Sequence, residues 1–152
     1  MKPILVIGEC GVGKTYVMSC LAKECHRRGK IGLFRFHFND KIVIPGVFDG
    51  SMFQGSDKLS MAVTRDLDKF TQWSKDKIVI YEGDRFTNSK ILSLKPFVIK
   101  IAGDGAEGRR KRGSKQSERH LKSIATRVAN IDADIVAEDS VEALVIIRKM
   151  II

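Results

Sequence analysis

Gly8-Glu9-Cys10-Gly11-Val12-Gly13-Lys14-Thr15 decides the fold of this chain. The stretch matches the pattern G-x-x-x-x-G-K-[ST] in full. It stands between an apolar run at residues 4–7, which predicts a buried strand, and an amphipathic run at residues 15–28, which predicts a helix. In such a loop, glycines let successive backbone N–H groups face phosphate oxygens, and the positive end of the helix dipole adds to the attraction. The pattern therefore predicts a loop that holds the phosphates of a nucleotide.

Each position of this loop has an expected role in binding ATP and Mg²⁺, the two cofactors that the pattern indicates. Lys14 can reach the β- and γ-phosphates, and the Thr15 hydroxyl can take a position on the metal ion. A glycine turn that binds nothing is the alternative, and the placement between a strand and a helix argues against it. The residues expected to bind the nucleotide are Gly8, Cys10, Gly11, Val12, Gly13, Lys14, Thr15 and Tyr16.

The composition is typical of one small domain, which we place at residues 1–152. Charged residues make up 30% and apolar residues 43%, as in an ordinary globular protein. No apolar run approaches the ~20 residues that span a membrane, so we expect no membrane contact. Because the predicted first strand starts within a few residues of Met1, we expect no signal peptide, and the three cysteines fit no zinc spacing. These features favour a cytoplasmic protein.

The net charge of +9 comes from 27 basic and 18 acidic residues, and much of it lies in one segment. Residues 103–127 hold eight basic residues and three acids, a difference of +5. A concentration of this kind favours a polyanionic partner such as DNA.

Short apolar runs alternate with amphipathic runs along the chain. The alternation predicts an α/β fold of three layers, with a mainly parallel, five-stranded sheet and helices on both of its faces. Asn39-Asp40 is typical of a hairpin turn and indicates a β-hairpin insertion or an edge strand. Strands are expected at residues 4–7, 33–38, 41–48, 77–81, 97–101 and 133–137, and helices at residues 15–28, 60–73, 88–94, 117–130 and 139–151. Because ligands of such folds bind beyond the carboxyl ends of the strands, functional residues should follow strands.

A second polar cluster follows the apolar run at residues 77–81. A strand that ends in an acid is the usual place for a carboxylate near Mg²⁺, and both Glu82 and Asp84 qualify as metal ligands. Asp84 is also a candidate for orienting the reacting hydroxyl, and Arg85 could hold a phosphate or an acceptor base. The alternative is a surface turn with a local pair of opposite charges.

The third cluster is an arginine-rich loop at about residues 103–117. Arg109, Arg110 and Arg112 could close over bound ATP as a lid, exclude water and stabilise the charge that develops during phosphoryl transfer. Arg109 and Arg112 are the expected catalytic members. A solvated basic loop, or a nonspecific grip on nucleic acid, remains open as an alternative.

With these clusters in order, the chain resembles the P-loop nucleoside and nucleotide kinases. Asp84-Arg85-Phe86 is similar to the Asp-Arg-aromatic element of thymidylate kinases. The runs at residues 55–63, 82–86 and 112–116 look like those of a narrower group, the phage-type P-loop kinases that phosphorylate 5-hydroxymethyluracil within DNA. The resemblance implies a P-loop kinase fold and transfer of the ATP γ-phosphate to the hydroxymethyl oxygen of the base. It also implies DNA as the acceptor and, if a phage encodes the chain, the host cytoplasm as its location.

An acceptor within DNA fits the basic surface, and a base must leave its stack to be phosphorylated. Phe48, Phe53 and Phe86 are candidates to stack on that base, although core packing is the simpler role for each of them. Asp57 is the favoured group to accept or align the hydroxyl proton, and capping of a helix near Ser60 is its alternative role. The residues expected at the acceptor are Asp49, Lys58, Ser60 and Arg85.

Two other functions remain open on the sequence. A free nucleoside or nucleoside monophosphate kinase would share every ATP-binding residue. A nucleotide-gated DNA-binding protein would keep the loop without the transfer, although the Asn-Lys-x-Asp pattern of a GTPase switch is absent.

Overall fold

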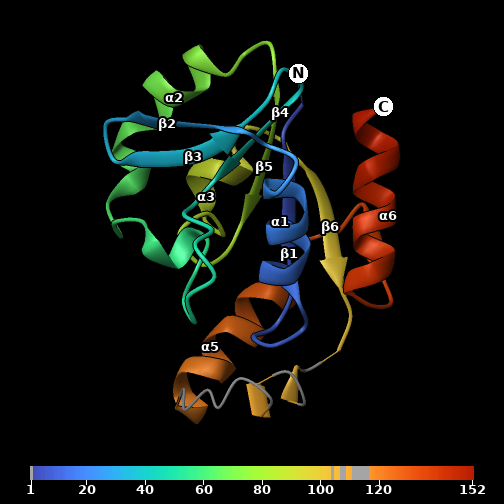
Figure 1. The fold of residues 1–152 in the computed structure, drawn as a ribbon. Helices are drawn as coiled ribbons and strands as arrows, with labels where there is room; N and C mark the ends of the chain where they lie inside the picture. Colours follow the sequence, from blue (N-terminus) through green and yellow to red (C-terminus); the bar gives the residue numbers. More distant parts are fainter. Residues whose placement is uncertain (1, 104, 107–108, 111–116) are drawn as a thin grey trace.

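The computed structural model describes residues 2–103, 105–106, 109–110 and 117–152. It shows a mixed α/β fold in which a seven-stranded sheet lies between helices (Figure 1). The strands are β1 (Ile4–Ile7), β2 (Arg27–Ile31), β3 (Phe34–Phe38), β4 (Ile42–Pro45), β5 (Ile78–Glu82), β6 (Phe97–Ile101) and β7 (Ile135–Ala137). The helices are α1 (Lys14–Ala22), α2 (Leu67–Trp73), α3 (Ser89–Leu92), α5 (Glu118–Ala129) and α6 (Ser140–Ile151), with 3₁₀ turns η1 (Ser56–Lys58) and η2 (Val63–Asp66).

The sheet corrects the predicted strand count and composition. Its order is β2-β3-β4-β5-β1-β6-β7; β4, β5, β1, β6 and β7 pair in parallel, whereas β2, β3 and β4 pair antiparallel. The prediction of a mainly parallel five-stranded sheet is therefore wrong, because the hairpin strands belong to the same sheet and extend it to seven.

Strand β2 was not predicted, because the helix expected in this region ends earlier than its sequence pattern indicates. Residues 15–28 were expected to be helical throughout, but α1 ends at Ala22 and residues 27–31 pair with β3. The predicted hairpin turn is confirmed: the Asn39 side chain accepts hydrogen bonds from the backbone N–H groups of Lys41 and Ile42, at 2.8 and 2.9 Å.

Two apolar cores cover the two faces of the sheet. The strand β1 is buried on both sides, with Ile4 and Val6 facing the core of α1 and α6, and Leu5 and Ile7 facing the core of α2, α3 and α5. On the second face the rings of Phe34 and Phe70 stack with centroids 4.2 Å apart. No helix among the described residues has the length and apolar character needed to cross a membrane.

The topology places the loop after β1 at a switch point. The chain leaves β1 for α1 on one face, whereas its neighbours β5 and β6 continue to α3 and α5 on the other face. Connections that diverge in this way open a crevice beyond the strand ends, which is where α/β sheets bind ligands.

Candidate phosphate-binding site and adjoining pocket

Residues 8–13 and the first turn of α1 have the backbone geometry that an anion requires. Gly11 and Gly13 have φ of 92° and 100°, in the left-handed region that glycine favours. When left-handed residues alternate with a residue of ordinary backbone conformation, successive N–H groups turn toward one side and form a concave nest that binds anions. No described side chain caps the N-terminus of α1, which begins at Lys14. The loop can therefore present its amides and the helix dipole to a phosphate.

Close neighbours fix the loop in this conformation. A Cβ atom added to Gly13 would lie 2.7 Å from Cβ of Ser140, the first residue of α6. A Cβ atom added to Gly11 would lie 2.8 Å from the backbone nitrogen of Arg109. Contact with α6 on one side and with the arginine-rich segment on the other thus requires glycine at both positions.

The Lys14 side chain lies over the loop. Its Nζ donates to the carbonyl oxygens of Gly8 and Glu9, at 2.6 and 3.0 Å. The ammonium group is therefore held beside the nest, where a bound phosphate would find a positive charge.

The arginine-rich segment touches the same loop. Nη1 of Arg109 donates to the carbonyl oxygen of Cys10 at 2.7 Å, and the Arg109 backbone N–H donates to Gly105 at 3.0 Å. Arg110 is exposed. Arg112, predicted as the second catalytic arginine, lies outside the described residues. The structure thus brings Arg109 to the loop.

The two candidate metal ligands after β5 differ in surroundings. Glu82 is 6% exposed at the end of β5, in register with Val6 of β1. Its Oε2 lies 3.9 Å from the position that a Cβ atom on Gly55 would take, so the carboxylate faces the segment before η1. Asp84 instead forms an ion pair with Arg127 of α5. Glu82 is therefore the carboxylate held directly at the strand end.

A hydroxyl and a carboxylate fit Mg²⁺ chemically. Thr15 is the second residue of α1, the helix after β1, and Glu82 ends the neighbouring strand β5; both offer the oxygen ligands that Mg²⁺ prefers. Within the described part of the chain, no three His, Cys, Asp or Glu side chains gather as a metal site. Magnesium in nucleotide sites commonly uses one or two protein ligands and completes its shell with phosphates and water.

The predicted acceptor residues gather around η1. Nη1 of Arg85 lies 3.7 Å from Oδ1 of Asp57, and Nε of Arg85 donates to the carbonyl oxygen of Leu59 at 3.4 Å. The helix expected from Ser60 begins instead as the 3₁₀ turn η2 at Val63, which has no side-chain cap; the Ser60 hydroxyl accepts from the Ala62 N–H at 3.1 Å. Asp57 instead faces Arg85.

Asp49 lies within electrostatic reach of Lys58, the last residue of η1. Its carboxylate accepts from the Ser51 N–H at 3.0 Å. Hydrogen bonds from Ser51 and the positive charge of Lys58 hold the pKa of Asp49 below its ordinary value. Asp49 and Lys58 thus belong with Asp57 and Arg85 in one polar group, with Ser60 exposed at its edge.

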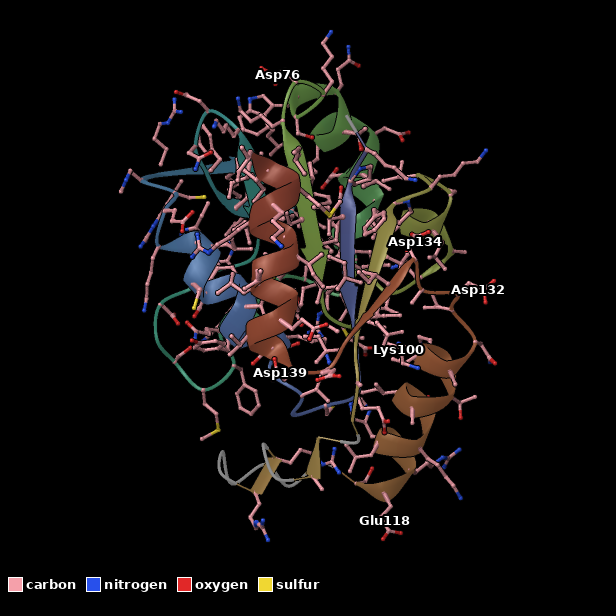
Figure 2. All side chains as sticks on the ribbon, turned by 90° about the vertical axis from the view of Figure 1, so that its right-hand side faces the viewer. Asp76, Lys100, Glu118, Asp132, Asp134 and Asp139 are labelled. Carbon is pink, nitrogen blue, oxygen red and sulfur yellow. The ribbon has the colours of Figure 1, made fainter. Side chains whose placement is uncertain are left out.

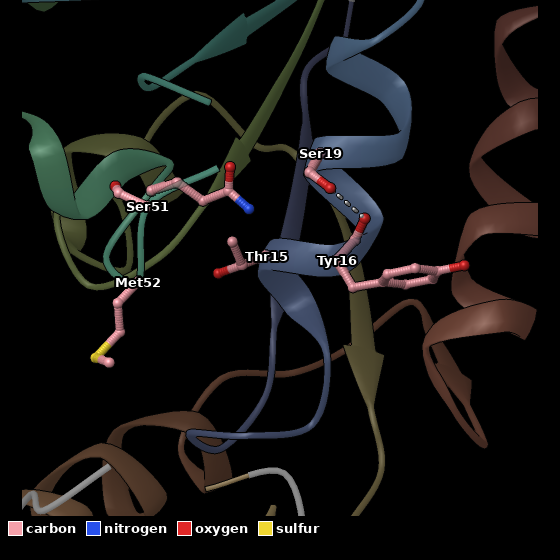
Figure 3. Close-up of a pocket in the computed structure, with 6 residues that line it drawn as sticks. Thr15, Tyr16, Ser19, Ser51 and Met52 are labelled. Carbon is pink, nitrogen blue, oxygen red and sulfur yellow. Dashed lines mark hydrogen bonds between the residues drawn. The ribbon is translucent and has the colours of Figure 1, made fainter. Parts of the chain in front are cut away.

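A pocket of about 410 Å³ separates α1 from residues 50–54 (Figure 3). Its volume lies within the range that small ligands occupy. Its lining residues are Thr15, Tyr16, Ser19, Ser51, Met52 and Gln54. Because Thr15 directly follows the glycine-rich loop and also lines the pocket wall, a molecule in the pocket would lie beside that loop.

The three aromatic residues considered for base stacking differ in how far they are buried. Phe86 is fully buried, and Phe48 packs against His37 with ring centroids 5.5 Å apart. Phe53 is 60% exposed, next to Met52 of the pocket wall. Among the three, Phe53 is the most exposed, whereas Phe48 is partly buried.

Several residues of the site were not predicted from the sequence. Ser19 lies four residues after Thr15, so helical periodicity alone would have placed both on one face of α1. Met52 and Gln54 carry no such signal, because a loop positions them. The pairing of Arg127 with Asp84 spans 43 residues and needs the tertiary fold.

Comparison with models of protein families and with curated proteins found no match for this chain. The support for a function therefore comes from the loop, the strand ends and the pocket.

Proposed function

We propose that the chain is a P-loop kinase that transfers the γ-phosphoryl group of ATP to a base hydroxyl, with 5-hydroxymethyluracil in DNA as the acceptor. The observation that carries the proposal is the double position of Thr15, which follows the phosphate-binding nest and also lines a pocket large enough for a base. Donor and acceptor would then meet across a single side chain.

On the donor side, the residues of the loop bind and orient. The nest amides hold the phosphates, and Lys14 neutralises their charge from the position that it takes over Gly8 and Glu9. Thr15 and Glu82 would hold Mg²⁺, which supplies charge stabilisation to the transferring group when bound. Arg109, held at Cys10, adds a cation on the side of the arginine-rich segment.

On the acceptor side, the polar group around η1 would receive the hydroxyl. Asp57 would take the hydroxymethyl proton while Arg85 keeps the carboxylate in position, 3.7 Å away. As the O–P bond forms, the bond from the γ-phosphorus to its bridging oxygen breaks, and ADP leaves. Met52 and Phe53 offer apolar surface for an unstacked base, which stacking stabilises by about 1–3 kcal/mol.

A free nucleoside or nucleoside monophosphate kinase is the second candidate. The pocket volume favours it as well, since 410 Å³ is enough for a small nucleotide. The two candidates share the ATP side and differ only in the acceptor.

The test offers γ-labelled ATP to wild-type protein with a panel of acceptors: duplex DNA with and without 5-hydroxymethyluracil, and the free nucleosides and nucleotides. We expect label in the hydroxymethyluracil DNA alone. Lys14→Ala should abolish the transfer, and Lys23→Ala, an exposed lysine just beyond the other end of α1, should preserve it as a matched control. Label in mononucleotides would favour the second candidate, and equal transfer by Lys14→Ala would remove the proposed site.

A further inference from the structure

We infer that the β2–β3 hairpin carries a docking surface for the phosphate backbone of DNA, formed by Arg28, Lys30 and Arg35. We call these three residues the basic stripe. The inference deepens the proposed function, because it says where the strand that bears the acceptor base would lie.

Strand register places the three side chains on one face. Arg28 pairs with His37 and Lys30 with Arg35, and residues directly opposite each other in an antiparallel pair point to the same side. Phe36 points the other way, into the core of α2, and Gly29 makes room for its ring: a Cβ atom there would lie 2.6 Å from Cζ of Phe36.

The face of the stripe is the face of α1 and of the pocket. His37 pairs with Ile44, whose side chain belongs to the core beneath α1. Nε2 of His37 accepts from the Phe48 N–H at 3.2 Å, which ties the hairpin to the segment that leads into the pocket wall. Burial and the positive charge of Arg28 lower the pKa of His37.

The stripe also reaches the correct end of the sheet. Because β4 runs parallel to β5, the antiparallel strand β3 begins at the edge where the phosphate loop lies, and Arg35 is near that beginning. Nη2 of Arg35 donates to the carbonyl oxygen of Lys58 at 2.5 Å. Lys58 in turn faces Asp49, two residues before the pocket residue Ser51.

Charge is distributed unequally between the two edges of the sheet. Residues 27–41, at the β2 edge, hold five basic residues and one acid, Asp40, which pairs with Arg27. Residues 132–139, at the β7 edge, hold four acids and no basic residue; Asp132 and Asp134 lie there in Figure 2. A polyanion would thus be drawn to the hairpin side.

Protection of an edge strand does not account for the whole stripe. Charges on an edge strand commonly prevent sheet extension, which would explain Arg28 and Lys30. Arg35 lies on β3, an inner strand flanked by β2 and β4. Within the described part of the chain, no carboxylate forms an ion pair with any of the three. Cations without acidic partners on one exposed face suit phosphate groups.

The experiment measures binding of a fluorescein-labelled single-stranded oligonucleotide by anisotropy between about 50 and about 200 mM salt. We expect the variant Arg28→Gln/Lys30→Gln/Arg35→Gln to reduce the salt slope by about 2, since each lost contact with a single strand removes about 0.7. The affinity should fall by about tenfold or more. Arg28→Gln/Lys30→Gln, which keeps the Arg35 bond to Lys58, should show about two thirds of that reduction in the salt slope.

The control variant Lys69→Gln/Lys75→Gln/Lys90→Gln removes three lysines from α2, α3 and the segment between them, on the opposite face, and should bind as wild type does. Equal losses in both triple variants would show that only net charge matters and would overturn the stripe. An unchanged slope in the hairpin variants would overturn it too, even if label from ATP reaches DNA. Loss of binding in the hairpin variants, with no label reaching any DNA acceptor, would support the stripe and refute the proposed kinase.

Discussion

Replacing Gly13 with alanine is expected to destabilise the protein by about 2–5 kcal/mol. Two costs add. At φ of 100°, the left-handed backbone conformation of an alanine lowers the free energy of unfolding by about 1–2 kcal/mol. The new Cβ would also lie 2.7 Å from Cβ of Ser140, and such overpacking costs about 1–3 kcal/mol.

Two companion variants separate these costs. Gly50→Ala has a similar φ of 81° and nothing within 4 Å of the added atom, so it should cost only about 1–2 kcal/mol. Ser140→Gly removes the clashing atom, and the double variant Gly13→Ala/Ser140→Gly should recover about 1–3 kcal/mol relative to additivity.

Urea unfolding of each variant gives its free energy of unfolding. The ATP affinity of the same samples reports whether the nest keeps its conformation. We expect Gly13→Ala to weaken ATP binding and Gly50→Ala to leave it closer to wild type. Equal destabilisation by Gly13→Ala and Gly50→Ala, or no coupling to Ser140→Gly, would refute the packing of the loop against α6.

Three further predictions follow from the site and the core. Arg109→Ala should lower kcat by about 10³-fold in a phosphoryl-transfer assay, as loss of an arginine finger does, and a loss below tenfold would remove its catalytic role. Glu82→Gln should reduce activity and raise the Mg²⁺ requirement far more than Asp84→Asn; the reverse order would exchange the proposed roles of the two residues. Asp84→Asn should change stability by at most about 1 kcal/mol, because its ion pair with Arg127 is partly exposed to solvent. Burial raises the pKa of the Cys25 thiol to about 11, so the folded state holds that proton more tightly and stability should fall as pH rises from the ordinary thiol pKa toward 11. Cys25→Ala should flatten that fall in urea titrations, and an identical pH profile would contradict the burial of the thiol.

Local patterns predicted the parts of the fold that local physics controls. The glycine-rich turn at residues 8–13, the buried run of β1 and the Asn39 turn depend on residues within a few positions of one another. Asp139 illustrates the same point: its Oδ1 accepts from the Glu142 N–H at 2.8 Å and caps α6, which begins at Ser140, close to the expected start at residue 139.

Tertiary pairing decided what the patterns missed. Arg27 and Arg28 favour the end of a helix by charge, yet β3 offers residues 27–31 a ladder of backbone hydrogen bonds, and the chain becomes β2. The surroundings of Asp84 likewise depend on Arg127, which sequence periodicity places on a helix without showing what it faces.

The most direct measurement of the central claim is the chemical identity of the product. DNA containing 5-hydroxymethyluracil, incubated with the protein, ATP and Mg²⁺, is digested by nucleases to mononucleotides, without a phosphatase, and analysed by mass spectrometry. The proposal predicts a hydroxymethyluracil mononucleotide that carries one additional phosphoryl group with wild-type protein and none with Lys14→Ala. Mononucleotides without that group from the wild-type reaction, with ATP shown to be bound, would contradict it.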